Sequence, residues 1–173
     1  DREEEADTFF AQQEAVLREM EEEKDPDGNG KTVAYFFVNS SGSVVVRRTE
    51  DYIPGMIELA GGVYCMSGVQ ALEEAKRSSV NISMEEFYEK AVNADYIVYN
   101  GTIEVPISSV DELIGKSPLF ADFKAVKEGN VWFTTPDYFQ ISNALGSMIL
   151  DFNKMLTNED ETVTAFTYLF QLP

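Results

Sequence analysis

The sequence predicts an α/β fold, a three-layer lobe in which helices flank a mostly parallel central sheet. Three short apolar runs, residues 31–38, 95–99 and 131–134, have the composition of strands that are buried on both faces. Segments with helical periodicity lie before and between these runs, so helices and strands alternate along the chain. Such alternation is typical of a parallel sheet whose strands are connected through helices.

The first part of the chain predicts a helix followed by a strand pair. Residues 2–24 place apolar side chains at three-to-four spacing opposite an acidic face, and the turn residues 25–30 end this helix. The buried run 31–38 leads through a polar turn, residues 39–43, into a short strand at residues 44–47.

Further helices are predicted where a residue with a capping side chain precedes a segment of helical periodicity. Four such positions follow the strand pair: Thr49 or Glu50, Ser83, Ser109 or Asp111, and Ser117-Pro118. At Ser83 the signal is a capping box, because Glu86 occupies the third helical position. The first of these helices reaches about Ala60, where Gly61-Gly62 ends it, and the second reaches about Asn93.

The rest of the chain gives fewer signals. Residues 67–80 predict a polar loop with one helical turn. Gly129-Asn130 forms a turn before the third buried run, and a last long helix extends from about Tyr138 to Leu156.

Composition excludes several kinds of chemistry. A chain of 173 residues has the size of one domain or of one large lobe. Its 13 basic and 31 acidic residues give a net charge of −18, which disfavours nucleic acid as a partner. The absence of His excludes Ser-His-Asp catalysis and a His-ligated metal, and the single Cys excludes an internal disulfide.

The location of the protein follows only weakly from the sequence. No run approaches the roughly 20 apolar residues that span a membrane, and no signal peptide is visible. The sequence begins inside a charged helix without an initiator Met, so we expect the natural amino terminus to lie further upstream.

No pattern of a catalytic or phosphate-binding site stands out. Gly28-Asn29-Gly30 follows a helix and precedes a strand, which is the reverse of the order in a dinucleotide fingerprint. The acidic runs 3–5, 21–23 and 159–161 are typical of solvated surface rather than of a sheltered acid/base pair. We therefore expect that the protein is not an enzyme and needs no cofactor or bound metal of its own.

Two features are candidates for ligand binding at the ends of the predicted strands. Arg47-Arg48 is a basic pair in an acidic chain and can hold an anionic group, or else it balances neighbouring surface acids. Tyr52, Tyr138 and Phe139 lie at the positions of a binding rim, because ligands of such sheets gather beyond the carboxyl ends of the strands.

Three segments together resemble a known family. They are residues 47–64 (RRTEDYIPGMIELAGGVY), 82–99 (ISMEEFYEKAVNADYIVY) and 119–140 (LFADFKAVKEGNVWFTTPDYFQ). In this order they resemble the C-terminal lobe of the iron-siderophore and cobalamin class of ABC-transporter solute-binding proteins, the type III or helical-backbone periplasmic binding proteins. The resemblance implies two α/β lobes joined by a long helix. Residues 1–24 then correspond to the rear part of this inter-lobe helix and residues 31–173 to the C-terminal lobe, with the N-terminal lobe outside this sequence.

The resemblance also implies a function. The expected protein binds a ferric siderophore or similar metal chelate between its lobes and delivers it to an ABC permease. It is extracytoplasmic, either a cell-surface lipoprotein of a Gram-positive bacterium or periplasmic, and it meets the membrane only through an N-terminal lipid anchor. The expected ligand contacts are Arg47, Arg48, Tyr52, Asn100, Tyr138 and Gln140, and the expected permease contacts are Glu85 and Glu86.

A different interpretation remains open from the sequence. A free-standing flavodoxin-like module has a similar order of elements and binds a phosphate-containing ligand at the end of its first strand. The loop at residues 39–43 (NSSGS) is polar and small enough to hold a phosphate group.

Overall fold

The computed structural model describes residues 30–69, 78–103, 107–136, 145–157 and 166–173, together with Thr8, Ala11, Glu14, Ala15 and Arg18. These five residues of the first segment are helical, and the remainder of the helix predicted at residues 2–24 lies outside the described residues.

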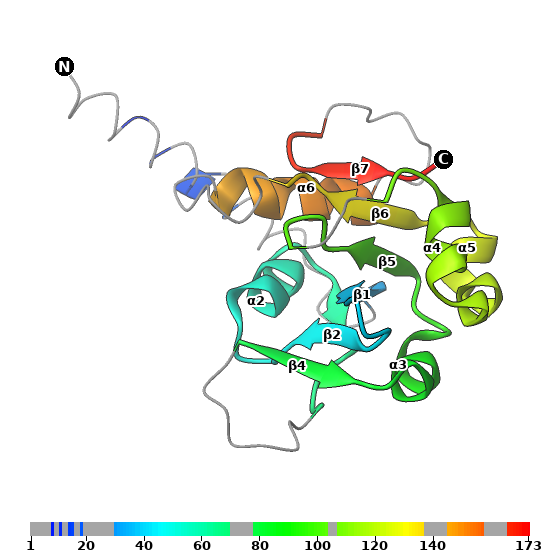
Figure 1. Cartoon of the computed structure of the whole chain (residues 1–173). Coiled ribbons are helices and arrows are strands. Elements are labelled where there is room, and N and C mark those ends of the chain that lie inside the picture. The colour runs from blue at the N-terminus through cyan, green and yellow to red at the C-terminus, as the bar shows by residue number, and fades with distance from the viewer. Residues whose placement is uncertain are drawn as a thin grey trace.

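A mixed sheet forms the middle layer of the described structure (Figure 1). Its order is β4-β2-β1-β5-β6-β7, and β3 pairs with the first residues of β1. The strands are β1 Thr32–Val38, β2 Val44–Arg47, β3 Val63–Tyr64, β4 Ser79–Ile82, β5 Tyr96–Tyr99, β6 Val131–Thr134 and β7 Leu169–Gln171. The parallel pairs β1–β3, β1–β5 and β5–β6 form the centre, and β2, β4 and β7 add antiparallel pairs at the edges. The predicted α/β class and the three buried strands are confirmed.

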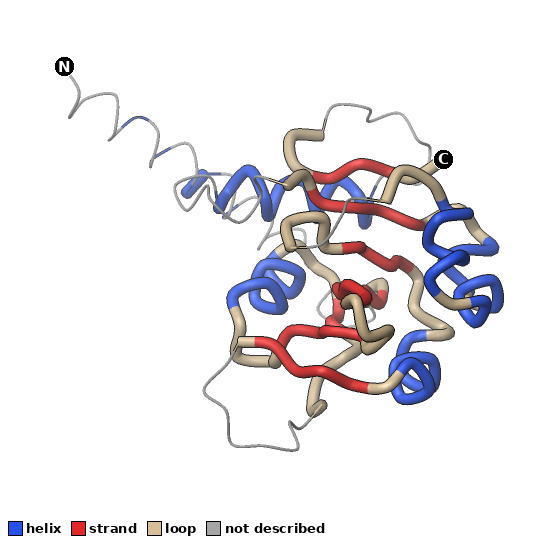
Figure 2. The backbone as a smooth tube through the Cα atoms, in the orientation of Figure 1, coloured by secondary structure: helices blue, strands red, loops and turns tan. Residues whose placement is uncertain are grey.

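Helices cover both faces of this sheet (Figures 1 and 2). They are α2 Tyr52–Leu59, α3 Met84–Ala91, α4 Val110–Lys116, the 3-10 helix η1 Pro118–Asp122, α5 Lys124–Lys127 and α6 Leu145–Thr157. Helices α2 and α6 pack together on one face, where Asn153 donates to the Ala60 carbonyl, and α3, α4 and α5 lie on the other. The layers agree with the predicted arrangement.

The aromatic core explains why β1 is buried on both faces. Phe36 points to the face of α3 and η1, where its ring centroid lies 4.5 Å from that of Phe87 and 5.5 Å from that of Phe120. Tyr35 points to the opposite face, because successive strand residues alternate, and it is only 1% exposed. A run without polar alternation is therefore what this strand requires.

The helix caps mostly agree with the sequence. The side chains of Ser83, Ser109 and Ser117 each accept a backbone N–H at a helix start, as predicted. The cap of α2 is Asp51 rather than Thr49 or Glu50, so that prediction is wrong by one or two residues. Strands β3, β4 and β7 were not predicted, and the residues of the last helix before Leu145 lie outside the described residues.

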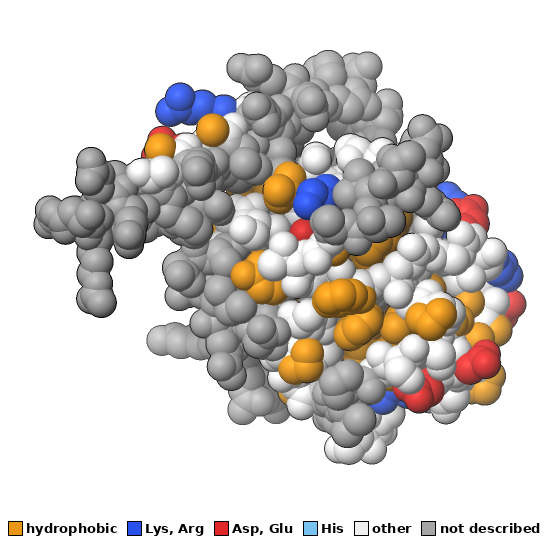
Figure 3. Space-filling view, turned by 90° about the horizontal axis from the view of Figure 1, so that it is seen from above, with side chains coloured by type: hydrophobic (Ala, Val, Ile, Leu, Met, Phe, Trp, Pro, Cys, Tyr) orange, Lys and Arg blue, Asp and Glu red, His pale blue; other side chains and the backbone are white. Residues whose placement is uncertain are grey.

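The molecule has a face on which apolar side chains gather, visible in the view from above in Figure 3. The edge strand β7 exposes Phe170, which is 42% accessible and stacks on Phe133 at 5.5 Å between ring centroids.

Within the described part of the chain, no helix is long and apolar enough to cross a membrane.

Candidate ligand-binding site

Polar side chains from five elements, β1, β2, α2, the end of β5 and β6, meet near the carboxyl ends of the parallel strands. We call them the carboxyl-edge cluster: Tyr35, Arg47, Asp51, Tyr52, Asn100 and Thr134. The sequence separates these residues widely, and the pairing of β1 with β2, β5 and the neighbouring β6 brings them together.

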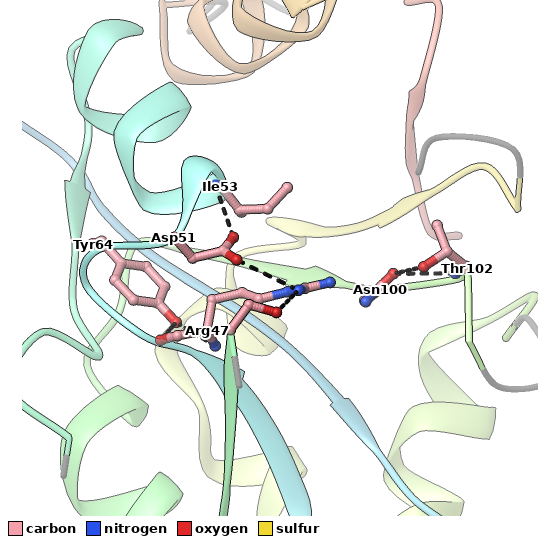
Figure 4. Close-up of polar contacts among 7 residues, drawn as sticks. Arg47, Asp51, Ile53, Tyr64, Asn100 and Thr102 are labelled. Carbon is pink, nitrogen blue, oxygen red and sulfur yellow. Dashed lines mark hydrogen bonds and ion pairs between the residues drawn. The ribbon is translucent and has the colours of Figure 1, made fainter. Parts of the chain in front are cut away.

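Arg47 is a buried cation with an internal partner. It ends β2, and its Nη1 lies 3.6 Å from Oδ2 of Asp51 and donates to Ser78 Oγ at 3.2 Å (Figure 4). The Arg47 and Asp51 side chains are 8% and 3% exposed. Burial of an ion pair is tolerated only where both charges are paired and hydrogen-bonded, so Asp51 stabilises Arg47 in this position.

Two further contacts fix the geometry of this pair. Asp51 Oδ1 accepts the N–H of Ile53 at 3.0 Å, which makes Asp51 the N-cap of α2. The Tyr64 hydroxyl accepts the Arg47 N–H at 3.0 Å and donates to the Arg47 carbonyl at 2.9 Å. The end of β2 and the start of α2 are therefore held as one rigid corner.

Tyr35 supplies a neutral donor beside Arg47. Burial raises the pKa of the Tyr35 phenol, and the nearby Arg47 guanidinium and Thr134 side chain offset only part of that rise. The hydroxyl consequently stays protonated at neutral pH. Tyr52 lies near the same charges, and burial likewise raises its pKa, but its side chain is 42% exposed and borders the solvent.

Asn100 presents a second neutral donor. Its Oδ1 accepts both the N–H and the hydroxyl of Thr102, at 3.1 and 2.6 Å. A backbone N–H can only donate, so this contact fixes the amide orientation and leaves Nδ2 as the free end. Nδ2 is buried and has no hydrogen-bond partner among the described residues, and Figure 4 shows it pointing toward the Arg47 guanidinium.

The backbone after Asn100 approaches β6 closely. The Gly101 N–H donates to Thr134 Oγ1 at 3.0 Å, and a Cβ at Gly101 would lie 2.4 Å from the Thr134 carbonyl oxygen. Only glycine fits this contact. The close approach holds the neighbouring Asn100 beside Thr134.

The two ends of the sheet differ in how well their polar groups are satisfied. At the amino end, Asp95 accepts the N–H and hydroxyl of Thr32, both at 2.8 Å, and pairs with Lys124. At the carboxyl end, buried polar atoms of Tyr99, Asn100 and Thr135 have no partner among the described residues. Native proteins rarely leave such groups unpaired without a reason, and a bound ligand is one.

The structure brings together some of the predicted ligand contacts. Arg47, Tyr52 and Asn100 belong to the carboxyl-edge cluster. Arg48 is half-buried and its carbonyl accepts the Asp51 N–H at 3.0 Å, but no described contact joins its side chain to the cluster. Tyr138 and Gln140 lie outside the described residues. The ligand role of all six residues stays a prediction.

Sequence reasoning missed three members of the cluster: Tyr35, Asp51 and Thr134. In the sequence, Tyr35 is one more aromatic residue of an apolar strand. The only signal for a polar role is its hydroxyl, which needs a hydrogen-bond partner when it is buried. Asp51 is one of several acidic and hydroxyl residues before α2, so the sequence alone did not single it out as the partner of Arg47.

Glu85 and Glu86 are exposed on the first turn of α3. Val38 pairs with Val44, which in turn pairs with Ile82, so α3 begins at the same end of the sheet as the cluster. Ser83 Oγ accepts the backbone N–H of Glu86 at 3.1 Å, so this cap does not engage either carboxylate. No group of acidic or sulfur ligands suited to a metal ion occurs among the described residues.

The fold defines the class of an α/β protein with helices on both faces of a mixed sheet, and comparison with known proteins gives the family. A family model described as "Periplasmic binding protein" matches residues 1–138, and the chain belongs to this family. A lipoprotein of Methanocaldococcus jannaschii, described as uncharacterized, is 31% identical over 97 residues, which is 53% of this chain and 24% of the relative.

Solved structures share the fold at low sequence identity. A periplasmic binding protein from Veillonella parvula is 20% identical with a TM-score of 0.65, over 88% of this chain and 50% of the other. A possible iron-binding, periplasmic solute-binding protein from Staphylococcus epidermidis is 15% identical with a TM-score of 0.65, over 91% and 57%. The siderophore periplasmic binding protein from the fuscachelin gene cluster of Thermobifida fusca is 20% identical with a TM-score of 0.63, over 90% and 54%. This chain thus spans about half the length of the structures that it matches.

Proposed function

We propose that this chain is the C-terminal lobe of a solute-binding protein of an ABC importer, and that it forms one wall of a cleft for a ferric siderophore or similar metal chelate. The observation that carries the proposal is the carboxyl-edge cluster at the sheet end where α/β folds bind ligands, with its buried Asn100 Nδ2, which has no partner among the described residues. Family membership and the iron- and siderophore-related neighbours support the same class of ligand.

The remaining parts of the proposal follow from the same family. Residues 1–24 form part of the helix that joins this lobe to an N-terminal lobe, and residues 31–173 form the C-terminal lobe. Family membership and the lipoprotein relative support an extracytoplasmic location, and we propose in addition an N-terminal lipid anchor. The role is one of binding and delivery, without catalysis and without a resident cofactor.

The structure disfavours a phosphate site in the loop at residues 39–43. The backbone N–H groups of Ser41 and Ser43, which would have to bind the phosphate, both donate to Asn39 Oδ1 at 3.0 Å. The loop also joins two antiparallel strands instead of leading into a helix, so no helix N-terminus faces it. The flavodoxin-like alternative therefore loses the feature on which it depended.

Ligand binding is tested with two exposed residues of one helix. Tyr52, a member of the cluster, is the first residue of α2, and Leu59 is the last residue of this helix. Their side chains are similarly exposed, at 42% and 37%. In the two-lobed protein, Tyr52→Ala is expected to weaken binding of a ferric hydroxamate chelate about tenfold or more, since a lost aromatic contact and hydroxyl together exceed about 1.4 kcal/mol. Leu59→Ala should leave the affinity unchanged. The readout is isothermal titration calorimetry, and equal effects of the two variants would contradict this site.

Permease docking is tested separately from ligand binding. We propose that Glu85 and Glu86 meet arginines of the permease, because both are exposed at the cleft end of the sheet. Glu85→Lys is expected to lower chelate uptake in cells at least about fivefold, since like charges oppose docking, while chelate affinity stays unchanged. Glu128→Lys, at the opposite end of the sheet before β6, is the matched control and should transport normally. Normal uptake by Glu85→Lys and Glu86→Lys would remove both residues from the docking surface.

A further inference from the structure

The charges of the carboxyl-edge cluster cancel. Arg47 is its buried cation, and Asp51 lies 3.6 Å away with a side chain that is only 3% exposed. The adjoining segment 47–51 holds two basic and two acidic residues, so it carries no net charge. An anion that approached the Arg47 guanidinium would therefore also meet the Asp51 carboxylate.

The donors that remain for a ligand are neutral. The Tyr35 phenol is neutral at neutral pH, and burial raises its pKa further. The Asn100 amide is directed by Thr102 so that its nitrogen is the free end. Asn100 is 1% exposed, and its Nδ2 has no partner among the described residues. Such groups stabilise an uncharged carbonyl or amide oxygen without requiring a buried net charge.

The electrostatic field of the whole chain also disfavours anionic ligands. With 13 basic against 31 acidic residues, the chain carries a net charge of −18, which slows and weakens the approach of a polyanion. A neutral or cationic molecule meets no such barrier.

We infer that this lobe selects a neutral or cationic chelate that presents carbonyl oxygens, as ferric hydroxamates do, and discriminates against polyanionic ferric catecholates. The inference rests on the proposed function and narrows its substrate class. It departs from the expectation that Arg47 and Arg48 bind an anionic chelate, because the Arg47 charge already has a buried partner.

The test compares three ferric chelates of different charge on the two-lobed protein by isothermal titration calorimetry. The probes are the neutral hydroxamate ferrichrome, the cationic hydroxamate ferrioxamine B and trianionic ferric enterobactin. At low ionic strength at least one hydroxamate is expected to bind about tenfold tighter than the catecholate or better, and raising the salt concentration should narrow the difference, because salt screens the repulsion of the trianion. Tighter binding of the catecholate would overturn the inference and leave the proposed function standing, whereas no binding of any probe would overturn both.

A charge placed at the border of the cluster gives a second readout. Tyr52→Lys adds a cation at the site on a half-exposed position. The loss of the Tyr52 ring weakens all chelates alike, so the expected result is a rise of about tenfold in the ratio of the affinity for the trianionic chelate to that for neutral ferrichrome at low salt. Leu59→Lys adds the same charge at the far end of α2 and should not change it. If Tyr52→Lys also leaves this affinity ratio unchanged, charge at this cluster does not select the ligand and the inference fails.

Discussion

Replacement of Asp51 by asparagine is expected to lower the free energy of unfolding by about 3–5 kcal/mol, because it leaves the Arg47 guanidinium buried without a counter-charge. Asparagine is as good an N-cap as aspartate, so the cap of α2 is kept and the measured loss reports the ion pair. Urea unfolding followed by circular dichroism measures the change.

Two further variants separate the ion pair from other effects of the substitution. The double variant Arg47→Met with Asp51→Leu removes both charges and is expected to regain most of the lost stability, as other buried pairs do when apolar residues replace them. Asp122→Asn breaks the exposed pair with Lys127, where the side chains are 62% and 60% accessible, and should change stability by less than about 1 kcal/mol. If Asp51→Asn were as mild as Asp122→Asn, Arg47 would not depend on Asp51, and the cluster would hold a usable cation.

The ion pair gives Arg47 a role that its position in the sequence did not reveal. The sequence left two roles open for this basic pair, anion binding and balance of neighbouring surface acids. The structure pairs Arg47 with a neighbouring acid, but that acid, Asp51, is buried rather than on the surface. The i,i+4 spacing of Arg47 and Asp51 spans a strand end and a turn, so the helical rule for such pairs does not apply to it. The turn closed by the Asp51 N–H, which donates to the Arg48 carbonyl at 3.0 Å, and the corner held by Tyr64 together bring the two groups into place.

The strands show the same division between local and tertiary information. The apolar runs of β1, β5 and β6 were predictable, because strands buried on both faces have no polar positions. Strand β4 (SVNI) alternates polar and apolar residues over only four positions and follows a polar stretch, and β3 and β7 have two and three residues. Segments this short form strands because a neighbour offers them hydrogen bonds, which no local pattern records.

The residues that join β5 to β6 illustrate what the sequence could give of the site. Asn100-Gly101 was recognised as a turn, and Asn100 was a candidate ligand contact through resemblance alone. Its free amide nitrogen depends on Thr102, and the need for Gly101 depends on the approach of Thr134 from a strand more than thirty residues away. Candidate positions were therefore accessible from sequence, whereas the direction of each donor was not.

The largest effect expected in the core is at Phe36. Phe36→Ala should lower the free energy of unfolding by about 3–5 kcal/mol, because the cavity left in a close-packed core cannot collapse fully. The Phe36 ring is 1% exposed and contacts Phe87, Phe120 and Tyr99 at centroid distances of 4.5, 5.5 and 5.6 Å, so three aromatic contacts are lost at once.

Phe170→Ala is the matched control, since it removes the same side chain from the exposed edge strand β7. Phe170 is 42% accessible, and its loss should cost less than about 1.5 kcal/mol in the same urea titration. Equal losses for the two variants would mean that α3 and η1 do not pack on this face of β1. The sheet would then lack the support that holds its carboxyl end rigid, and the positions of Tyr35 and Asn100 beside Arg47 would lose their physical basis.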